Sequence, residues 1–439
     1  MNASTSEPIA AAAPSLFRNP NYLWLWASAA ISSLGDYFTL IAMPWLVLSI
    51  SHDSAALGIV MALESLPRAA FMLFSGSASD RFTARSVLLV SRFLFMLALL
   101  ALALMLLAGR IQLHHLYGFA VTFGLLTAFA LPANRALLPQ VVERSQIQKS
   151  NSALMGSQQL IQLFAPVLAG LLIWGLPSVS APDAAGAAGA DLRHIAYAFL
   201  FNAGAIAVAL VLLLRVRVTA AGKAPGTVRV RLTEGFRYLR QDDGMRIATL
   251  YMGCIGFFAI GPLLTVIPQL AQQRLQDGAL SYGLLYAVNG LGSMLGFALG
   301  GMLPKPGPQR LGKVMLCADL VAGLSIAWLA HADRLVTAAP ALALIGVAAS
   351  YGGVLGLSWI QERVPPSLTG RVLSIVMFAV LGLTPLSMSA AGLLAANYSL
   401  SLLLTTSGAA IVAVALLGLA TPAIRRFGAY PVPASYREA

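Results

Sequence analysis

Long apolar runs alternate with short polar segments along the whole chain. Twelve runs reach the roughly 17 residues or more that an α-helix needs to cross a bilayer. They are predicted at residues 22–50, 55–75, 86–108, 116–138, 153–174, 195–214, 247–270, 282–303, 314–330, 337–359, 372–396 and 400–420. The runs are continuous, whereas an outer-membrane barrel would show alternating strands of about ten residues. The pattern therefore predicts an all-α integral membrane protein with twelve transmembrane helices.

Composition supports this interpretation. Hydrophobic residues make up 58% of the 439 residues, and charged residues only 10%. A soluble protein carries about 25% charged residues, so a large soluble core is excluded because too few polar faces would meet water. The lipid bilayer is therefore an expected partner of the chain.

A polar, basic segment divides the chain into two halves of six spans. We expect a tail at 1–21, a six-helix bundle at 22–214, a connector at 215–246, a second bundle at 247–420 and a tail at 421–439. A shift of 219 residues places Glu143-Arg144 on Glu362-Arg363 and Pro166 on Pro385. The halves are therefore predicted to be parallel repeats. Within the connector, residues 233–240 form either a short helix on the membrane surface or a solvated linker.

The loop charges predict the orientation. With the N-terminus inside, 23 Lys and Arg residues fall in inside segments and 4 in outside segments. Arg92 is counted here with the inside residues of the second loop. By the positive-inside rule both termini are cytoplasmic. The net charge of +12 is then a consequence of membrane topology, and no nucleic-acid partner is expected. The first twenty residues lack the features of a cleaved signal peptide.

Residues for cofactor or enzyme chemistry are missing from the sequence. It has no Gly-rich phosphate-binding loop, and its five histidines show no zinc spacing. Cys254 and Cys317 both lie inside apolar runs, where they are expected to pack as small hydrophobic residues. No metal, no cofactor and no enzymatic activity are predicted.

Four ionisable residues within the spans are candidates for function, because charges inside a bilayer are costly. Asp36 lies near the middle of the first span, and Glu64 and Arg68 share one face of the second. Asp319 lies in the ninth span, where a structural role is favoured. The first two spans run in opposite directions, so Asp36 and Glu64 should come to similar depth. Two carboxylates would then face one arginine.

That arrangement has two interpretations. Burial favours a neutral carboxyl group, and a nearby arginine favours the ionised form, so one carboxyl could take up and release a proton. Asp36, Glu64 and Arg68 would then couple proton or substrate movement. Alternatively, they form a fixed ion-pair network that holds the first two spans together.

A charged loop between the second and third spans contains Gly76, Asp80, Arg81 and Arg85. Its spacing resembles the G-x-L-A-D-R-x-G-R-R/K loop of the major facilitator superfamily of transporters, although Ala78, Ser79, Thr83 and Ala84 depart from the pattern. The resemblance implies a cytoplasmic gating loop in which Asp80 docks on the start of the eleventh span near Gly370-Arg371 and favours the outward-open state. The alternative is a loop with ordinary positive-inside arginines.

Small residues and prolines indicate close or moving helix contacts. Gly292, Gly296 and Gly300 form a face that allows two helices to approach closely. The run from Ala165 through Pro166 to Gly170 resembles the G-P-x-x-G-G signature of superfamily antiporters, with alanine at two glycine positions. Pro385 holds the matching position in the second half. These residues serve either as hinges or as static packing.

Four further side chains are candidates for lining a substrate cavity. Tyr37 and Phe38 follow Asp36 directly, and Tyr286 and Asn289 are polar residues in the eighth span. They would contribute to the cavity from both halves of the protein.

At a finer level the chain resembles the macrolide-efflux and enterobactin-exporter branch of the superfamily. The similar segments are 35–36 with 43–48, 131–142, 151–154, 234–239 and 370–372. This resemblance implies a proton-driven exporter, monomeric, in a bacterial inner membrane. Three functions stay open: export of an amphipathic small molecule such as a drug or siderophore, a carrier of another substrate or direction including lysophospholipid movement, and a non-transporting membrane sensor. The few charges within the spans disfavour a strongly charged substrate.

Overall fold

The computed structural model describes residues 16–81, 83–143, 146–175, 187–217, 232–275 and 277–430. In these ranges, twelve helices are long and apolar enough to cross a membrane, and no residue lies in a strand. Each overlaps one of the spans predicted from the sequence, so the prediction of a twelve-helix membrane fold is confirmed.

The described part of the chain consists of helices joined by short connections. They are η1 (Leu16–Arg18), α1 (Pro20–Ser51), α2 (Ser54–Arg81), α3 (Ala84–Leu107), α4 (Leu113–Leu137), η2 (Leu138–Gln140), α5 (Ile147–Trp174), α6 (Ala187–Arg215), α7 (Leu232–Gln241), α8 (Asp243–Arg274), α9 (Gly278–Met302), α10 (Pro308–Leu329), α11 (Leu335–Arg363), α12 (Pro366–Leu381), α13 (Thr384–Asn397), α14 (Leu400–Ala420), α15 (Pro422–Arg425) and η4 (Phe427–Ala429).

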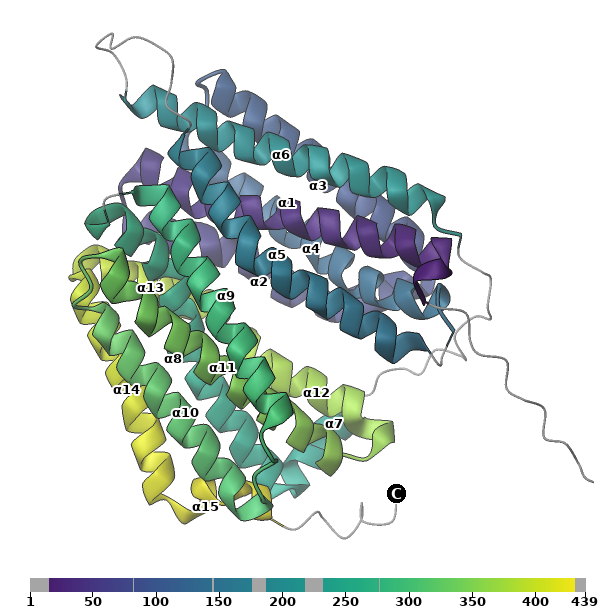
Figure 1. The fold of residues 1–439 in the computed structure, drawn as a ribbon, viewed down its shortest axis with the longest axis vertical. Helices are drawn as coiled ribbons and strands as arrows, with labels where there is room; N and C mark the ends of the chain where they lie inside the picture. The colour runs from purple at the N-terminus through teal and green to yellow at the C-terminus, as the bar shows by residue number, and fades with distance from the viewer. Residues whose placement is uncertain are drawn as a thin grey trace, which may run out of the picture.

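The long helices form two bundles (Figure 1). In the N-terminal bundle α1 packs on α5 and α6, and α3 packs on α4 and α6. In the C-terminal bundle α9 and α10 pack on α11, and α14 packs on α10 and α8. An even number of crossings brings Pro20, where α1 begins, and Ala420, where α14 ends, to the same side of the membrane. We call this the termini side, and the other the far side.

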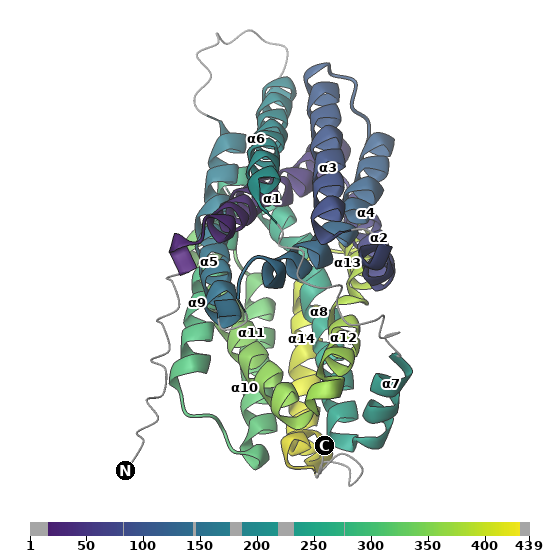
Figure 2. The same ribbon diagram turned by 90° about the vertical axis from the view of Figure 1, so that its right-hand side faces the viewer.

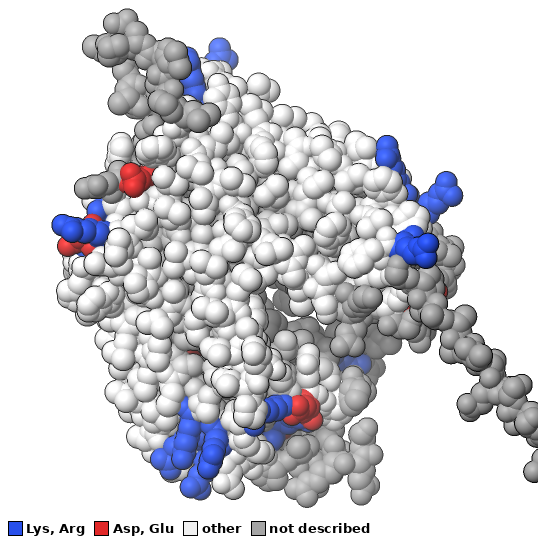
Figure 3. All heavy atoms as spheres, viewed as in Figure 1, with Lys and Arg blue, Asp and Glu red and all other residues white. Residues whose placement is uncertain are grey.

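The two bundles meet toward the far side. Ser54 at the start of α2 donates a hydrogen bond of 2.7 Å to Gln269 of α8. Gly58 of α2 lies so close to Gly392 of α13 that an added Cβ would sit 2.7 Å from its Cα atom. Between α5 and α9, a Cβ on Gly170 would lie 2.6 Å from the Ala279 carbonyl oxygen. Toward the termini side the bundles diverge, and the surface between them is hollowed (Figures 1 and 3). This conformation is open to the termini side.

Helix starts follow familiar capping rules. The Asn19 side chain accepts hydrogen bonds from the amides of Asn21 and Tyr22, and Pro20 occupies the first helical position of α1. The Thr83 side chain accepts from the Ser86 amide at the start of α3. Because α2 stays helical through Gly76 to Arg81, the connection to α3 is much shorter than the loop expected at 76–85. A single glycine lowers helix propensity by only about 1 kcal/mol and does not by itself end a helix.

The eleventh span differs from the single helix expected at 372–396, because it is broken into α12 and α13 at Gly382 and Leu383. Pro385 lies in the first turn of α13. Proline has no amide hydrogen and its ring excludes the carbonyl four residues earlier, so a helix cannot continue through it unstrained. Pro166, its counterpart in the sequence repeat, lies inside the unbroken α5.

The connector contains the amphipathic helix α7. Its Tyr238 is fully buried and Leu239 nearly so, in a cluster with Val372, Ile375 and other residues at the termini end of the C-terminal bundle. Gly235 lies against Arg371, and Glu234 forms an ion pair with the same arginine. Figure 2 shows α7 beside α12. The helix is therefore docked on α12, and is neither a freely solvated linker nor bound to the membrane surface alone.

Charged side chains gather at the ends of the bundles. In Figure 3 Lys and Arg lie at the lower end of the C-terminal bundle and at the right-hand end of the N-terminal bundle, both on the termini side. The surface between the ends is almost free of charge in this view. This distribution is typical of a protein whose middle lies in the hydrocarbon layer.

Candidate functional site

Asp36 forms an ion pair with an arginine of another helix. It lies halfway along α1, and its two carboxylate oxygens each accept a hydrogen bond of 2.9 Å from the Arg92 guanidinium of α3. The side chains are 36% and 17% exposed, respectively. A two-point contact fixes the arginine plane against the carboxylate. The pair therefore joins α1 to α3 and stays partly accessible.

Glu64 and Arg68 form a second pair, on α2. Arg68 Nη2 donates to Glu64 Oε1, and Arg68 Nε donates a bond of 3.2 Å to Thr127 Oγ1 of α4. Gly124 allows α4 to come close, since a Cβ there would lie 2.0 Å from the Glu64 carbonyl oxygen. This pair thus lies at the packed contact between α2 and α4.

The expected grouping of Asp36, Glu64 and Arg68 is therefore wrong in its geometry. Two carboxylates do not share one arginine, because Asp36 takes Arg92 as its partner. Arg92 had been counted among the residues of the inside loop, yet it lies well within α3 (Ala84–Leu107). Its place inside the apolar run 86–108 was the signal that could have identified it. The result is two balanced pairs instead of one site with net charge.

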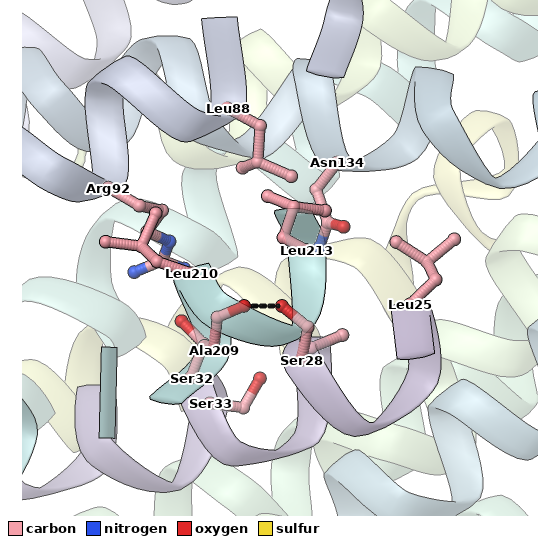
Figure 4. Close-up of a pocket in the computed structure, with 11 residues that line it drawn as sticks. Leu25, Ser28, Ser32, Ser33, Leu88, Arg92, Asn134, Ala209, Leu210 and Leu213 are labelled. Atoms are coloured by element: carbon pink, nitrogen blue, oxygen red, sulfur yellow. Dashed lines mark hydrogen bonds between the residues drawn. The ribbon is translucent and has the colours of Figure 1, made fainter. Parts of the chain in front are cut away.

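A small polar pocket adjoins the Asp36–Arg92 pair (Figure 4). Its polar lining comes from Ser28, Ser32 and Ser33 of α1, Arg92 of α3 and Asn134 of α4, and apolar residues of α1, α3 and α6 complete it. The pocket lies inside the N-terminal bundle and not between the bundles. Ser28 lies two turns before Asp36 on α1, and Ser32 lies one turn before it. Because α1 begins on the termini side, the pocket lies on the termini side of the ion pair.

Further polar contacts hold α1 to α6 around the same level. Asn202 of α6 is fully buried and donates a bond of 2.7 Å to Thr39 Oγ1. Its side-chain oxygen lies against Gly35, where a Cβ would be only 2.2 Å away. Glycine at position 35 therefore permits the close approach of α6 beside Asp36.

The four cavity candidates have different surroundings. Phe38 is 4% exposed and stacks on Phe201 of α6 at 4.1 Å, so it lies inside the N-terminal bundle. Asn289 donates a bond of 3.1 Å to the Leu342 carbonyl and holds α9 to α11. The burial of Phe38 does not fit the expectation that it lines a cavity. The cavity role of Asn289 stays a prediction. Tyr286 of α9 packs edge-on against Tyr282 of the same helix, with the ring centroids 5.3 Å apart. The cavity roles of Tyr37 and Tyr286 stay predictions.

The gating-loop residues are only partly described. The backbone of Gly76, Asp80 and Arg81 belongs to the end of α2, but their side chains lie outside the described residues. Arg85 donates to the carbonyls of Leu213 and Leu214, at the C-terminal end of α6. An arginine there satisfies carbonyl groups that lack a helical partner. The docking of Asp80 stays a prediction.

The small residues take part in two kinds of helix contact, one within a bundle and one between the bundles. Gly292, Gly296 and Gly300 face Ala343, Val347 and Val354 of α11, within the C-terminal bundle. Gly283 of α9 instead faces Pro166 of α5, where a Cβ would lie 2.2 Å from the Pro166 carbonyl oxygen. Contacts between the bundles therefore involve Pro166 and Gly170, and the glycine triplet packs two helices of one bundle. Any hinge role of these residues stays a prediction.

The C-terminal bundle has its own buried charges, at its termini end. Asp242 caps α8 through the Met245 amide at 2.9 Å and accepts bonds of 2.7 and 2.8 Å from Arg363 of α11. Tyr238 of α7 also donates to Asp242, and Arg363 donates to the Tyr430 carbonyl. Sequence inspection missed this network because both partners lie at span ends, where charges are common.

Asp319 of α10 accepts a hydrogen bond from Tyr251 of α8. The contact joins two neighbouring helices of the C-terminal bundle. Among the described residues, no group of three or more His, Cys, Asp or Glu side chains could hold a metal ion.

Comparisons with known proteins agree with this architecture. The sequence profile of the Major Facilitator Superfamily matches residues 25–383. The multidrug efflux pump Tap of Mycobacterium tuberculosis is 25% identical over 94% of this chain and 96% of its own length. Macrolide efflux protein A of Streptococcus pyogenes is 21% identical over 90% of this chain and 94% of its own length. A bacterial homologue of the iron transporter ferroportin, solved in an inward-facing state, superposes with a TM-score of 0.68 at 15% identity, over 94% of this chain and 99% of that one.

Proposed function

Because this chain belongs to the major facilitator superfamily, we propose that it exports an amphipathic small molecule across a bacterial inner membrane in exchange for protons. The observation that carries the proposal is the Asp36–Arg92 pair. It places a titratable carboxyl group halfway along a membrane-spanning helix, partly accessible, with one charged partner among the described residues. An intramembrane ionisable residue in a transporter fold is a functional site by default.

The relatives and the loop charges support the proposed direction of transport. Efflux proteins align over at least nine-tenths of this chain. The excess of Lys and Arg in the connections on the termini side makes that side cytoplasmic under the positive-inside rule. The conformation described above is then open to the cytoplasm, where an exporter takes up its substrate.

The Asp36–Arg92 pair supports a simple coupling scheme. In the cytoplasm-open conformation the Asp36 side chain is bonded through both oxygens to Arg92. When Asp36 takes up a proton from the outer side, it loses its charge attraction to Arg92, and the pair separates. Because the pair joins α1 to α3, its formation and loss would change how the helices of the N-terminal bundle pack. Alternating access around the space between the bundles would then couple inward proton movement to outward substrate movement.

The charges within the spans bear on the substrate class. Asp36 is paired with Arg92, and Glu64 is paired with Arg68. Spans whose charges are paired in this way suit an amphipathic molecule with few charges of its own, such as a drug or a siderophore. When the far side opens, the contact between Gly58 and Gly392 would break. The contacts of α5 with α9 at Gly170 and Gly283 would break as well.

The experiment uses purified protein in liposomes that hold a pH-sensitive dye. An outward substrate gradient is imposed with lipophilic cations, macrolides or catecholate siderophores. We expect proton movement that depends on one of these compounds and falls about 100-fold in Asp36→Asn, since an amide cannot carry the proton.

The matched control is Asp333→Asn, because this acid is 81% exposed outside the spans. It should behave as wild type. Substrate movement without protons, unchanged in Asp36→Asn, would refute proton coupling. Movement of none of the compounds would refute the proposed substrate class.

A further inference from the structure

The polar pocket beside Asp36 and Arg92 is too small for a substrate. Its volume is about 30 Å³, enough for one or two water molecules. Small-molecule sites measure about 300–1,000 Å³. Four helices, α1, α3, α4 and α6, supply its lining, and Figure 4 shows Arg92 and Asn134 on one side of the drawn residues and the serines of α1 on the other. Its occupant must therefore be of the size of water.

The chemistry of the lining requires water. Ser32 is 6% exposed, and its hydroxyl is buried without a hydrogen-bond partner among the described residues. A buried polar group without a hydrogen-bond partner destabilises the fold, so the hydroxyl needs a partner. The Ser28 hydroxyl donates a hydrogen bond of 2.8 Å to the Ala209 carbonyl. The Ser28 oxygen can therefore still accept a hydrogen bond from a water molecule. Asn134 adds a side-chain amide on the opposite wall.

The position of the pocket links it to the ion pair. Ser28, Ser32 and Asp36 follow one another at intervals of four residues, so they lie on one face of α1. Arg92 both lines the pocket and binds Asp36. The polar groups therefore continue from the ion pair toward the termini side, through the inside of the bundle. The hollow between the two bundles is a separate space.

We propose that this pocket is a water-filled proton passage, through which Asp36 releases its proton to the termini side without crossing the substrate route. The inference rests on the proposed function, in which Asp36 exchanges a proton. Water molecules bonded to Ser32 and Ser28 relay the proton away from the carboxyl group. The carrier can then deprotonate while a substrate occupies the space between the bundles.

Hydration is tested first, independently of transport. Cys254 and Cys317 are replaced with serine, and Ser32→Cys is introduced into this background. Vesicles are treated with Ag⁺ from the termini side, because Ag⁺ is small and reacts with thiolates, which form only in contact with water. The control is Val90→Cys, at an apolar position on α3 that is 58% exposed on the outside of the bundle.

We expect Ser32→Cys to react at least about ten times faster than Val90→Cys, because thiolates form where water reaches them. Residual thiols are counted by maleimide labelling after denaturation. Equal, slow reaction at both positions would overturn the proposal, because the pocket would then be dry.

The proton route is tested with two substitutions of equal shape. Ser32→Thr keeps a hydroxyl and Ser32→Val does not. Substrate-driven proton flux should stay within about twofold of wild type in the threonine variant and fall about tenfold in the valine variant, as expected when a proton-relay group is lost. Substrate affinity should be the same in both. Equal flux in the two variants would overturn the route.

The two tests separate failure of this inference from failure of the proposed function. If wild-type protein moves substrate without protons, proton coupling fails whatever Ag⁺ shows, and the passage fails with it. If wild type moves protons but the two variants do not differ, coupling stands and only the passage is refuted.

Discussion

Two aspartate–arginine pairs, one in each bundle, share the same two-point geometry in different surroundings. Asp36 and Arg92 meet at 2.9 Å through both oxygens, and Asp242 and Arg363 meet at 2.7 and 2.8 Å. The first pair joins α1 to α3 in the middle of the N-terminal bundle. The second joins α8 to α11 at the termini end of the C-terminal bundle. Geometry alone therefore does not distinguish a working pair from a structural one.

The surroundings make the difference. Asp242 is fully buried and accepts additional bonds from the Met245 amide and the Tyr238 hydroxyl, while Arg363 is 5% exposed and donates to Tyr430. Asp36 is 36% exposed and has a polar pocket next to its partner. A pair held by several further hydrogen bonds is fixed in place, whereas a pair with no further hydrogen bonds among the described residues can separate. We infer that the first pair works in coupling and the second fixes the fold.

The largest effect on stability is expected from Asp242→Ala. It leaves Arg363 buried without its charge partner and removes the cap of α8, and breaking a buried pair costs about 3–5 kcal/mol. Thermal unfolding in detergent should show a strongly lowered melting temperature. Transport per folded molecule should be unchanged. A wild-type melting temperature would show that this pair does not stabilise the fold.

Gly392→Leu at the far-side contact is expected to have an intermediate effect, on the balance between the two conformations. The added side chain meets Gly58, whose Cα atom would lie 2.6 Å from the new Cβ. Overpacking costs about 1–3 kcal/mol, here only while the far side is closed. The population of the far-side-open conformation should rise, as measured by distances between spin labels on α2 and α13.

Gly118→Leu is the matched control for this substitution, because nothing lies within 4 Å of a Cβ at that position. It should leave the distance distribution unchanged. If Gly392→Leu also leaves it unchanged, the far-side contact does not control the conformation.

The smallest effect is expected from Glu234→Gln, which removes the ion pair with Arg371 that helps to dock α7 on α12. Glu234 is 39% exposed, and exposed pairs contribute about 0–1 kcal/mol. The melting temperature should fall only slightly, and less at high salt. A loss as large as that of Asp242→Ala would mean that this pair, too, is part of the fixed network.

Sequence inspection predicted the twelve spans because a bilayer imposes length and hydropathy directly. It could not predict the break at Gly382, since Pro166 and Pro385 occupy equal positions in the repeat and only one interrupts its helix. The neighbouring Gly382 distinguishes the two, because both helices pack closely on a helix of the opposite bundle.

The candidate site was only partly predictable. Asp36, Glu64 and Arg68 were identified because ionisable residues are rare inside spans. The partner of Asp36 was not identified, because Arg92 reaches Asp36 from a helix that is distant in sequence. Phe38 shows the same limit, because its residue type and position on α1 do not reveal that its side chain stacks on Phe201 inside the N-terminal bundle.

The most direct test of the central claim compares net transport with exchange for wild type, Asp36→Asn and Asp242→Asn in the same liposomes. Net transport is driven by a pH gradient, and exchange of labelled for unlabelled substrate is measured at equal pH. We predict that Asp36→Asn loses net transport about 100-fold but keeps exchange, since it lacks only the proton-carrying group. Asp242→Asn should lose both in proportion to the protein that fails to fold. Full net transport by Asp36→Asn, or an equal loss of net transport and exchange, would contradict the account.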